Sequence, residues 1–175
     1  KVFEYIRREK GTGMDKLIRR AKDKDADAFA ELMQRQMQSM YKTAWAMVGN
    51  DEDVADVVQE TILTCYEKLD QLRTDAYFHT WLIRILVNKC NDLLRKRSRM
   101  QFTEEPIEIP VVDEAYENAE WKEVLMTLDE KYRVVVLLYY IEGLSTEDIG
   151  EILCLSESAV RTRLSRARKQ LEQKL

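Results

Sequence analysis

The C-terminal stretch from Leu144 to Leu175 constrains the fold more than any other part of the chain. Ser145 can cap a short helix with an apolar face, and Ser156 can cap a second helix after a tight break. The second helix has apolar residues at helical spacing on one side and these cations on the other: Arg161, Arg163, Arg166, Arg168 and Lys169. Two helices joined by a short turn, the second with an apolar back and a basic front, are typical of a helix-turn-helix.

This motif favours DNA binding for a direct physical reason. An α-helix fits the major groove, arginine forks can read guanine edges, and neighbouring cations hold phosphates. An arginine-rich terminal helix that is simply solvated is common, so the argument depends on the short helix and the capped turn before it. Because both are present, we predict that this segment binds DNA.

The net charge of −4 is unusual for a DNA-binding protein, but the charge is distributed unevenly along the chain. Residues 84–99 contain six Lys or Arg against one Asp, and residues 156–175 contain six against two Glu. Residues 101–120 hold seven acids and no Lys or Arg. Phosphate responds to local potential, so two basic blocks around an acidic segment are compatible with nucleic acid.

Composition favours helices and a reducing compartment. Charged residues make up 34% of the chain, and it has only five Gly and two Pro, without Asn-Gly or Asp-Gly hairpin signals. No apolar run approaches the roughly 20 residues of a membrane span. Cys65, Cys90 and Cys154 are odd in number and widely spaced, which argues against a disulfide framework or a zinc site. We therefore expect a cytoplasmic, all-α protein.

Apolar periodicity places further helices on both sides of an acidic segment. Within residues 15–49 we predict a short first helix that carries Leu17, Ile18 and Ala21, and then a long helix that Gly49 ends. Two further helices are predicted over 51–69 and 76–97, and Asp51 can cap the first of these. Pro106 and Pro110 interrupt the acidic stretch, which reads as a linker. Beyond it we predict helices over 115–128 and from Asp129 to about residue 142.

These patterns predict two small helical domains, over residues 14–97 and 115–175, joined by a linker over 98–114. The second domain ends in the helix-turn-helix. Residues 1–13 end in Gly-Thr-Gly ahead of Met14, and we interpret them as a leader, expression-derived or fused.

The sequence contains few residues that are suited to catalysis. His79 is the single histidine, and no glycine-rich phosphate loop is present, so we expect no enzyme activity, no metal site and no cofactor. Aromatic residues and cations do gather over 77–89, which is the combination that unstacked bases require. Phe78 and Trp81 could instead be core anchors, and for Trp81 we favour the core.

Three motifs in order carry a resemblance to a known family. They lie over residues 53–63, over residues 77–88 and, after the acidic linker, over residues 159–168. In this order and spacing the chain, over essentially 14–175, resembles the extracytoplasmic-function (group IV) sigma factors of bacterial RNA polymerase. The resemblance implies promoter recognition and strand opening, with the chemistry done by the polymerase.

The resemblance also implies three sets of site residues, one for each binding partner surface. Polymerase clamp contacts would be Asp56, Gln59, Glu60, Thr61, Leu63, Tyr66 and Leu69. Contacts to the minus-ten element would be Asp75, Tyr77, Phe78, Arg84, Asn88, Lys89, Arg95, Lys96 and Arg97. Contacts to the minus-thirty-five element would be Ser158, Arg161, Thr162, Arg163, Ser165, Arg166 and Arg168.

The implied partners are core RNA polymerase, through its clamp and flap, promoter DNA, and an anti-sigma factor, typically anchored in the membrane. No small-molecule substrate is implied. The chain departs from the family pattern at Gly150, where Ala is usual and where Gly costs up to about 1 kcal/mol of helix propensity. Ser165 lacks the aromatic bulk of some relatives, and the linker has no room for the middle domain of larger sigma factors.

Two other functions remain open from the residues alone. One is a dimeric helix-turn-helix regulator that binds duplex DNA without polymerase. The other is a protein-interaction adaptor that uses the methionine-rich helix, whose methionines are Met33, Met37, Met40 and Met47.

Overall fold

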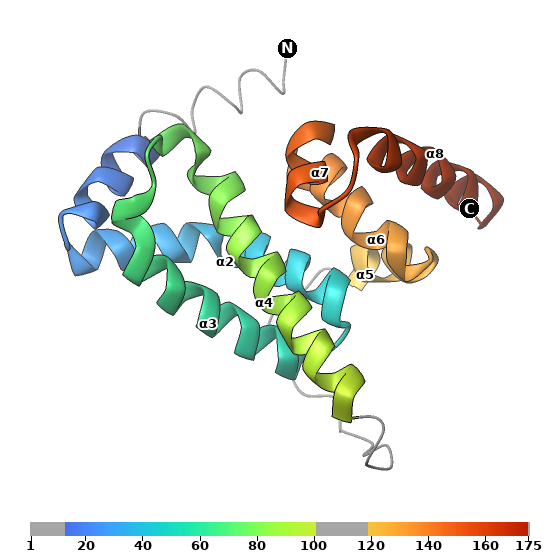
Figure 1. Ribbon diagram of the computed structural model, residues 1–175, viewed down its shortest axis with the longest axis horizontal. Coiled ribbons are helices and arrows are strands. Elements are labelled where there is room, and N and C mark those ends of the chain that lie inside the picture. Colours follow the sequence, from blue (N-terminus) through green and yellow to red (C-terminus); the bar gives the residue numbers. More distant parts are fainter. Residues whose placement is uncertain (1–12, 101–118, 175) are drawn as a thin grey trace.

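The computed structural model describes residues 13–100 and 119–174, and within them every regular element is a helix (Figure 1). The all-α prediction is therefore confirmed. The helices form two groups, and each group has a buried apolar interior. The predicted linker falls almost entirely outside the described residues, as do residues 1–12 of the predicted leader.

The N-terminal group is built around three long helices that contact one another pairwise. It comprises a helix over 13–22, α2 (Ala26–Val48), α3 (Asp51–Lys68), the short 3-10 helices η1 (Leu69–Gln71) and η2 (Asp75–Tyr77), and α4 (Phe78–Met100). Its interior contains fully buried side chains from each long helix and from the first helix: Ile18, Leu32, Met40, Cys65, Leu82 and Leu86. Their spacing is the apolar periodicity that the sequence shows.

Helix ends in this group follow local capping chemistry. Gly49 adopts a left-handed conformation with φ of 76° and ends α2, as predicted. The predicted cap Asp51 is wrong, because Asn50 caps α3 and its side chain accepts a hydrogen bond from the Asp53 amide at 2.9 Å. The cap position needs extended backbone, which Asn50 has (φ −149°, ψ 153°), whereas Asp51 is already helical.

The C-terminal group contains α5 (Ala119–Met126), α6 (Glu130–Val136), the π-helical turn η3 (Leu137–Ile141), α7 (Thr146–Leu153) and α8 (Glu157–Lys174). The segment from α6 through η3 is its central element, with Val135, Leu137 and Leu138 fully buried. Gly143 follows with φ of 69°, so the predicted left-handed end of this segment is confirmed.

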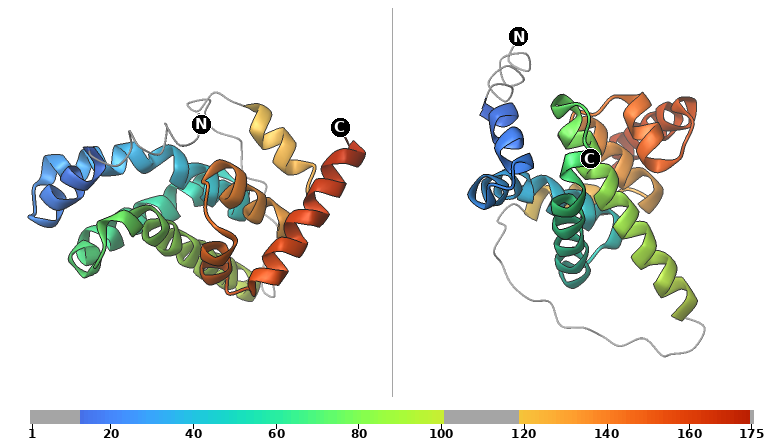
Figure 2. Two further views of the ribbon diagram at one scale, coloured as in Figure 1. Left: turned by 90° about the horizontal axis from the view of Figure 1, so that it is seen from above. Right: turned by 60° about the vertical axis from the view of Figure 1, so that its left-hand side comes forward.

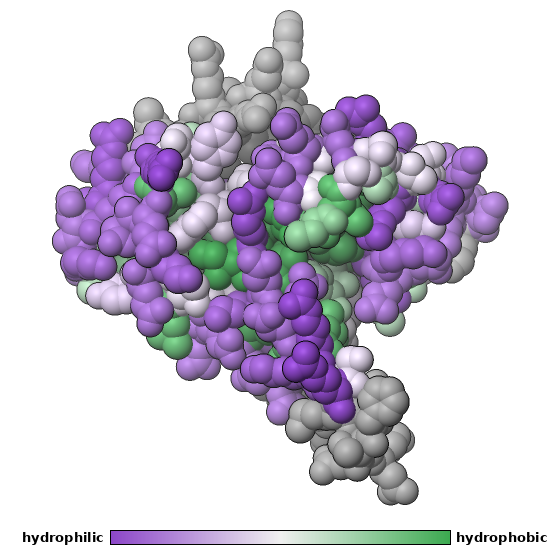
Figure 3. All heavy atoms as spheres, in the orientation of Figure 1, coloured by the Kyte–Doolittle hydropathy of each residue, from purple (hydrophilic) through white to green (hydrophobic). Residues whose placement is uncertain are grey.

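The two groups pack against each other. Helix α2 contacts α6 and η3, and α4 contacts α7. The views in Figure 2 show α7 and α6 lying beside the α2–α4 pair. In Figure 3 the apolar surface gathers in the middle of the displayed face, between hydrophilic flanks. The N-terminal and C-terminal groups of helices therefore share an interface.

The three cysteines are free, with Cys65 and Cys90 buried and Cys154 exposed. Burial raises the pKa of both Cys65 and Cys90 to about 12, which keeps these thiols protonated and unreactive. No helix in the described part of the chain has the length and apolar character needed to cross a bilayer.

Candidate nucleic-acid and protein interfaces

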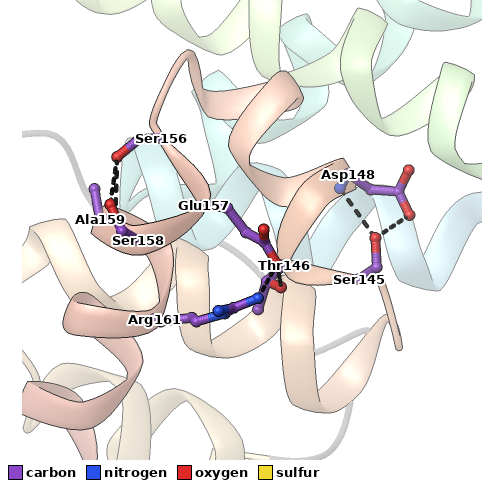
Figure 4. Close-up of polar contacts among 8 residues, drawn as sticks. All are labelled: Ser145, Thr146, Asp148, Ser156, Glu157, Ser158, Ala159 and Arg161. Carbon is purple, nitrogen blue, oxygen red and sulfur yellow. Dashed lines mark hydrogen bonds and ion pairs between the residues drawn. The ribbon is translucent and has the colours of Figure 1, made fainter.

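Side-chain caps begin both helices of the helix-turn-helix, as predicted. Ser145 Oγ accepts a hydrogen bond from the Asp148 amide at 3.0 Å and donates to the Asp148 carboxylate at 2.7 Å. Ser156 Oγ accepts from the Ala159 amide at 3.2 Å. Figure 4 shows these contacts at the starts of α7 and α8. Each cap satisfies an amide that the first helical turn leaves without a partner.

The turn between α7 and α8 is fixed by backbone contacts and one side-chain bridge. Cys154 takes a left-handed conformation with φ of 54°. Thr146 Oγ1 donates to Glu157 Oε1 at 2.7 Å across the turn (Figure 4). This hydrogen bond, followed by one from Arg161, lowers the pKa of Glu157. The two helices are thus held at a defined angle by local interactions.

Helix α8 presents one face to solvent and buries the other. Val160, Leu164 and Ala167 are buried against α6 and α7, as the spacing predicted. The opposite face exposes Ser158, Thr162, Ser165, Arg166 and Lys169. A helix with this division can enter a major groove while remaining anchored in the domain.

Two arginines predicted to face DNA lie on the flanks of α8 and contact their own domain. Arg163 Nη1 donates to the Lys131 carbonyl at 3.5 Å, and Arg168 Nε donates to the Tyr140 hydroxyl at 2.7 Å. Arg161 is exposed and pairs with Glu157 one turn earlier. Among the arginines of α8, Arg166 is the one whose side chain has neither an ion pair nor a hydrogen bond with the described residues.

Adjacent aromatic residues at the start of α4 have opposite environments. Tyr77 is 62% exposed, whereas Phe78 is 2% exposed and packs beside Trp81, with ring centroids 6.2 Å apart. The prediction that Phe78 contacts DNA bases does not fit this geometry, because a ring enclosed by the core cannot stack on a base. Tyr77 remains available for stacking.

Asp75, another predicted minus-ten residue, holds the first helix in place. Its carboxylate accepts from Lys22 Nζ at 2.6 Å and lies 3.5 Å from Arg19 Nε. Lys22 Nζ also donates to the Leu72 carbonyl at 2.7 Å. This carboxylate therefore has a structural role in joining the helix over 13–22 to the start of η2.

The cations of α4 divide into paired and available groups. Arg97 forms two contacts with the buried carboxylate of Asp53, at 2.5 and 2.6 Å, and Lys89 lies 3.5 Å from Glu60. The remaining exposed members of the predicted minus-ten set include Asn88, Arg95 and Lys96. Arg95 has a loose contact with Asp92 at 3.7 Å. The end of α4 therefore keeps a basic surface even though Arg97 is engaged.

Helix α3 carries an exposed stripe that we call the α3 stripe, consisting of Asp56, Gln59, Glu60, Leu63 and Tyr66. Leu63 is 58% exposed and Tyr66 45% exposed, and the two lie three positions apart on the same helix. Their spacing places carboxylates, an amide and two apolar groups on one helix face. The stripe therefore has the mixed polar and apolar character of a protein-docking surface.

Two residues predicted for that surface are buried instead. Thr61 is completely buried and donates its hydroxyl to the Val57 carbonyl at 2.6 Å, and Leu69 is 2% exposed. Helical geometry explains the correction for Thr61, because it follows Val57 and Val58 on the inward face. Leu69 is in η1, where the chain turns back into the core.

Comparison with known proteins accounts for both halves of the chain. The Sigma-70 region 2 family matches residues 32–100, and the Sigma-70, region 4 family matches residues 119–171. The ECF RNA polymerase sigma factor SigW of Bacillus subtilis is 30% identical over 179 residues, covering 91% of this chain and 95% of SigW. The chain belongs to the ECF RNA polymerase sigma factors.

Other relatives agree with this assignment. The RNA polymerase sigma factor CnrH of Cupriavidus metallidurans is 32% identical over 161 residues, covering 82% of this chain and 84% of CnrH. A solved structure of CnrH with the cytosolic domain of CnrY has a TM-score of 0.65 at 30% identity, covering 91% of this chain and 95% of that chain. RpoE of Bartonella quintana, solved with the anti-sigma factor NepR, has a TM-score of 0.67 at 24% identity and supports the fold.

Sequence reasoning missed four exposed large apolar residues on region 4 of this sigma factor. They are Val124 and Met126 on α5 and Tyr140 and Ile141 in η3, each between 39% and 56% exposed. For Tyr140 and Ile141 the signal available was the continuous apolar run at the end of the helix predicted from Asp129 to about residue 142, where a one-sided helix cannot bury every residue.

Proposed function

We propose that this sigma factor docks on core RNA polymerase through the α3 stripe and recognises two promoter elements with separate surfaces of regions 2 and 4. The observation that carries the proposal is the exposure of Leu63 and Tyr66 beside three polar residues on α3. Tyr66 packs against Phe29 and Lys24 with part of its ring, and a protein partner that covers Leu63 and the exposed part of Tyr66 explains why both face solvent. The exposed apolar residues of α5 and η3 are the candidates for a second polymerase contact, at the flap.

Minus-ten recognition is assigned to the start and the outer side of α4. Tyr77 is the exposed aromatic that can stack on an unpaired base, which contributes about 1–3 kcal/mol per base in comparable sites. Asn88, Arg95 and Lys96 are exposed along the same helix and can follow the phosphate backbone. Phe78 is a buried anchor at the start of α4 and packs beside Trp81.

Minus-thirty-five recognition is assigned to the exposed face of α8. Arg166 has the charge and freedom to bind a base edge, while Ser158, Thr162 and Ser165 offer hydroxyl groups beside it. Arg161 can contact phosphate from the flank. Arg163 and Arg168 are proposed to position α8 rather than read bases, since each already donates to its own domain.

A protein that covers these surfaces is also proposed. The solved CnrH structure contains the cytosolic domain of a second protein, CnrY. By analogy, we propose that an anti-sigma factor, anchored in the membrane, holds this chain in the cytoplasm until released. Domain limits of 14–97 and 115–175, with the connection between them, are proposed as the two functional units. The chain itself supplies no catalytic step, because polymerase makes the RNA.

The test is transcription in vitro on fragmented genomic DNA of the source organism, with core polymerase and purified chain, followed by sequencing of transcript 5′ ends. We expect new start sites that share two upstream elements and that require the added chain. Unchanged start sites, together with dimerisation in sedimentation and tight binding to duplex DNA without polymerase, would instead identify a dimeric regulator. Failure to bind either polymerase or DNA would point to an adaptor.

A further inference from the structure

One lysine joins two points of the segment that leads into α4. Lys22 is the last residue of the helix over 13–22, and its ammonium donates to the Leu72 carbonyl at 2.7 Å and to Asp75 Oδ1 at 2.6 Å. Both are charge-assisted hydrogen bonds of short length. The side chains of Lys22 and Asp75 are 22% and 19% exposed, so water competes less with these bonds than it does at an open surface. We call these three groups the Lys22 clamp.

The helix that carries Lys22 is firmly attached to the core of the N-terminal group. Its side chains at Leu17, Ile18 and Ala21 are buried. A cation in the last turn of a helix is also favoured by the helix dipole. Lys22 therefore reaches Leu72, 50 positions later in the chain, from a rigid support. This helix precedes residues 32–100, which the region 2 family matches, and none of the predicted site residues lies on it.

The clamp holds a segment, over residues 72–77, whose ends are buried and whose middle faces solvent. The side chains of Leu72 and of Phe78, just beyond the segment, are enclosed by the core. The side chains exposed between them are Arg73, Thr74, Ala76 and Tyr77. The Tyr77 amide donates to the Thr74 carbonyl at 3.0 Å, and the Phe78 amide donates to the Asp75 carbonyl. The clamp therefore fixes the same short stretch of backbone that these two amides close.

Order in this segment matters for binding an unpaired base. Fixing a loop at the moment of binding costs conformational entropy, and a loop that is already fixed avoids this cost. When the fixed form is only a fraction of the free molecules, the apparent affinity falls by that fraction. The Lys22 clamp acts from behind the segment, so it leaves the exposed ring of Tyr77 available to a base.

We propose that Lys22 is a positioning residue for minus-ten recognition, and that its ammonium holds the 72–77 segment in the shape that receives an unpaired base. The link to the minus-ten element rests on the proposed function, whereas the ordering of the segment by Lys22 does not. Asp75, a predicted minus-ten residue, then acts through Lys22 and not through contact with DNA.

Hydrogen exchange of single amides in the free, full chain tests the ordering. Lys22→Met keeps most of the apolar stem and removes the ammonium, so the Tyr77 and Phe78 amides should exchange about tenfold faster, as measured by nuclear magnetic resonance. Lys22→Arg can donate to both acceptors and should retain most of the protection. Lys16→Met, at an exposed position of the same helix, is the matched control and should exchange like the wild type.

Unchanged protection of the Tyr77 and Phe78 amides in folded Lys22→Met would overturn the clamp. If Lys22→Met does not fold, Asp75→Ala removes the carboxylate from the other side, and the same two amides decide the question. Faster exchange confined to this segment, with the amides of α3 still protected, would support local ordering by Lys22 and exclude a general loss of stability.

Transcription with core polymerase tests the positioning role, on a promoter found by mapping start sites as described above. Lys22→Met should form about tenfold fewer heparin-resistant open complexes and should discriminate less among promoters mutated in the minus-ten element. Base preference in the minus-thirty-five element and affinity for core polymerase should not change, because α8 and the α3 stripe are intact. Lys22→Arg should restore the minus-ten preference. An unchanged minus-ten preference in Lys22→Met would overturn the positioning role.

A double-mutant cycle separates the proposed role of Asp75 from direct contact with DNA. If Lys22 and Asp75 act as one unit, the double variant Lys22→Met with Asp75→Ala should lose about as much open complex as either single variant. Losses that multiply would show that Asp75 acts independently of Lys22 and would overturn its place in the clamp. If the wild-type chain leaves the start sites of core polymerase unchanged, the proposed function fails, while amide exchange in the free chain still decides whether Lys22 orders the segment.

Discussion

Gly150 and Leu155 meet across the turn of the helix-turn-helix more closely than any side chain would allow. The Leu155 amide donates to the Gly150 carbonyl at 2.8 Å, and a Cβ built on Gly150 would lie 2.8 Å from the Leu155 carbonyl oxygen. The missing side chain lets the turn fold back over α7. Close packing around Gly150 therefore offsets the free-energy cost of having glycine rather than alanine in a helix at this position.

Gly150→Ala should destabilise region 4 although alanine is the better helix former. The new methyl group meets backbone rather than a flexible side chain, so the turn must shift. We expect a net loss of about 1–2 kcal/mol in the free energy of unfolding, measured by urea denaturation. Ser165→Ala, at an exposed position of α8, serves as the control and should change little. Equal or greater stability of Gly150→Ala would contradict this account.

Arg166→Ala and Arg163→Ala should separate base reading from positioning. Arg166 is exposed, and its loss should cost roughly 1–3 kcal/mol of discrimination at one upstream base pair. Arg163 donates to the Lys131 carbonyl, so its loss should lower thermal stability and leave base preference intact. Transcription from a panel of promoters mutated in the upstream element measures both. An unaltered base preference in Arg166→Ala would show that this arginine does not read a base.

Tyr77→Ala should impair strand opening without unfolding the protein. Tyr77 is 62% exposed, so its removal should change stability by no more than about 0.5 kcal/mol. Loss of one stacked base should reduce heparin-resistant open complexes by roughly tenfold, and Tyr77→Phe should restore them. Phe78→Ala, by contrast, should cost about 3–5 kcal/mol of stability. Normal open-complex yield in Tyr77→Ala would exclude stacking by this ring.

Glu60→Arg should weaken binding to core polymerase while keeping the fold. The side chain is on the exposed α3 stripe, so charge reversal there acts on the partner surface and not on the core. It also loses the 3.5 Å contact with Lys89, which at such exposure contributes little. Binding is measured by fluorescence anisotropy, with Glu52→Arg on the same helix as the control. Equal polymerase affinity of Glu60→Arg and Glu52→Arg would contradict docking through the α3 stripe.

Closure of the two halves should weaken in acid because of Glu142. Burial raises the pKa of its carboxyl, but hydrogen bonds from His79 and Ser39, with attraction to His79 and Lys42, outweigh burial and hold the pKa below its ordinary value of 4.5. Opening returns the carboxyl to that ordinary value, so closure is favoured while it is ionised. As pH falls below about 4.5 and through the closed-state pKa, this contribution is lost.

The distance between spin labels on the native Cys154 and on Lys16→Cys, recorded between about pH 6 and pH 3.5, measures this effect. The open population should rise with acidity in the wild type, and Glu142→Gln should remove the carboxyl's share of that rise. Far-ultraviolet circular dichroism at each pH verifies that the helices remain folded. An identical pH profile in both proteins would show that another group controls closure.

A site residue could be predicted from the sequence when its environment is set by residues nearby in the chain. Ser145 and Ser156 were predictable as caps because a cap depends on residues three positions away. The orientation of Phe78 was left open between base contact and core, because an aromatic residue near a helix start can face either way. Arg97 was predicted as a DNA contact from its charge, but Asp53, 44 residues earlier, determines where it points.

Residue order alone was enough to predict the helices, the capped helix-turn-helix with its basic face, and membership of a family read from three ordered motifs. These follow from periodicity and short-range hydrogen bonding, which depend on nearby residues. The tertiary structure was needed to show which of the predicted contact residues reach solvent. It alone brought Glu142 to Ser39, 103 positions away in the chain. Such pairings depend on how whole helices pack, and burial of their apolar faces outweighs the preference of any single polar residue.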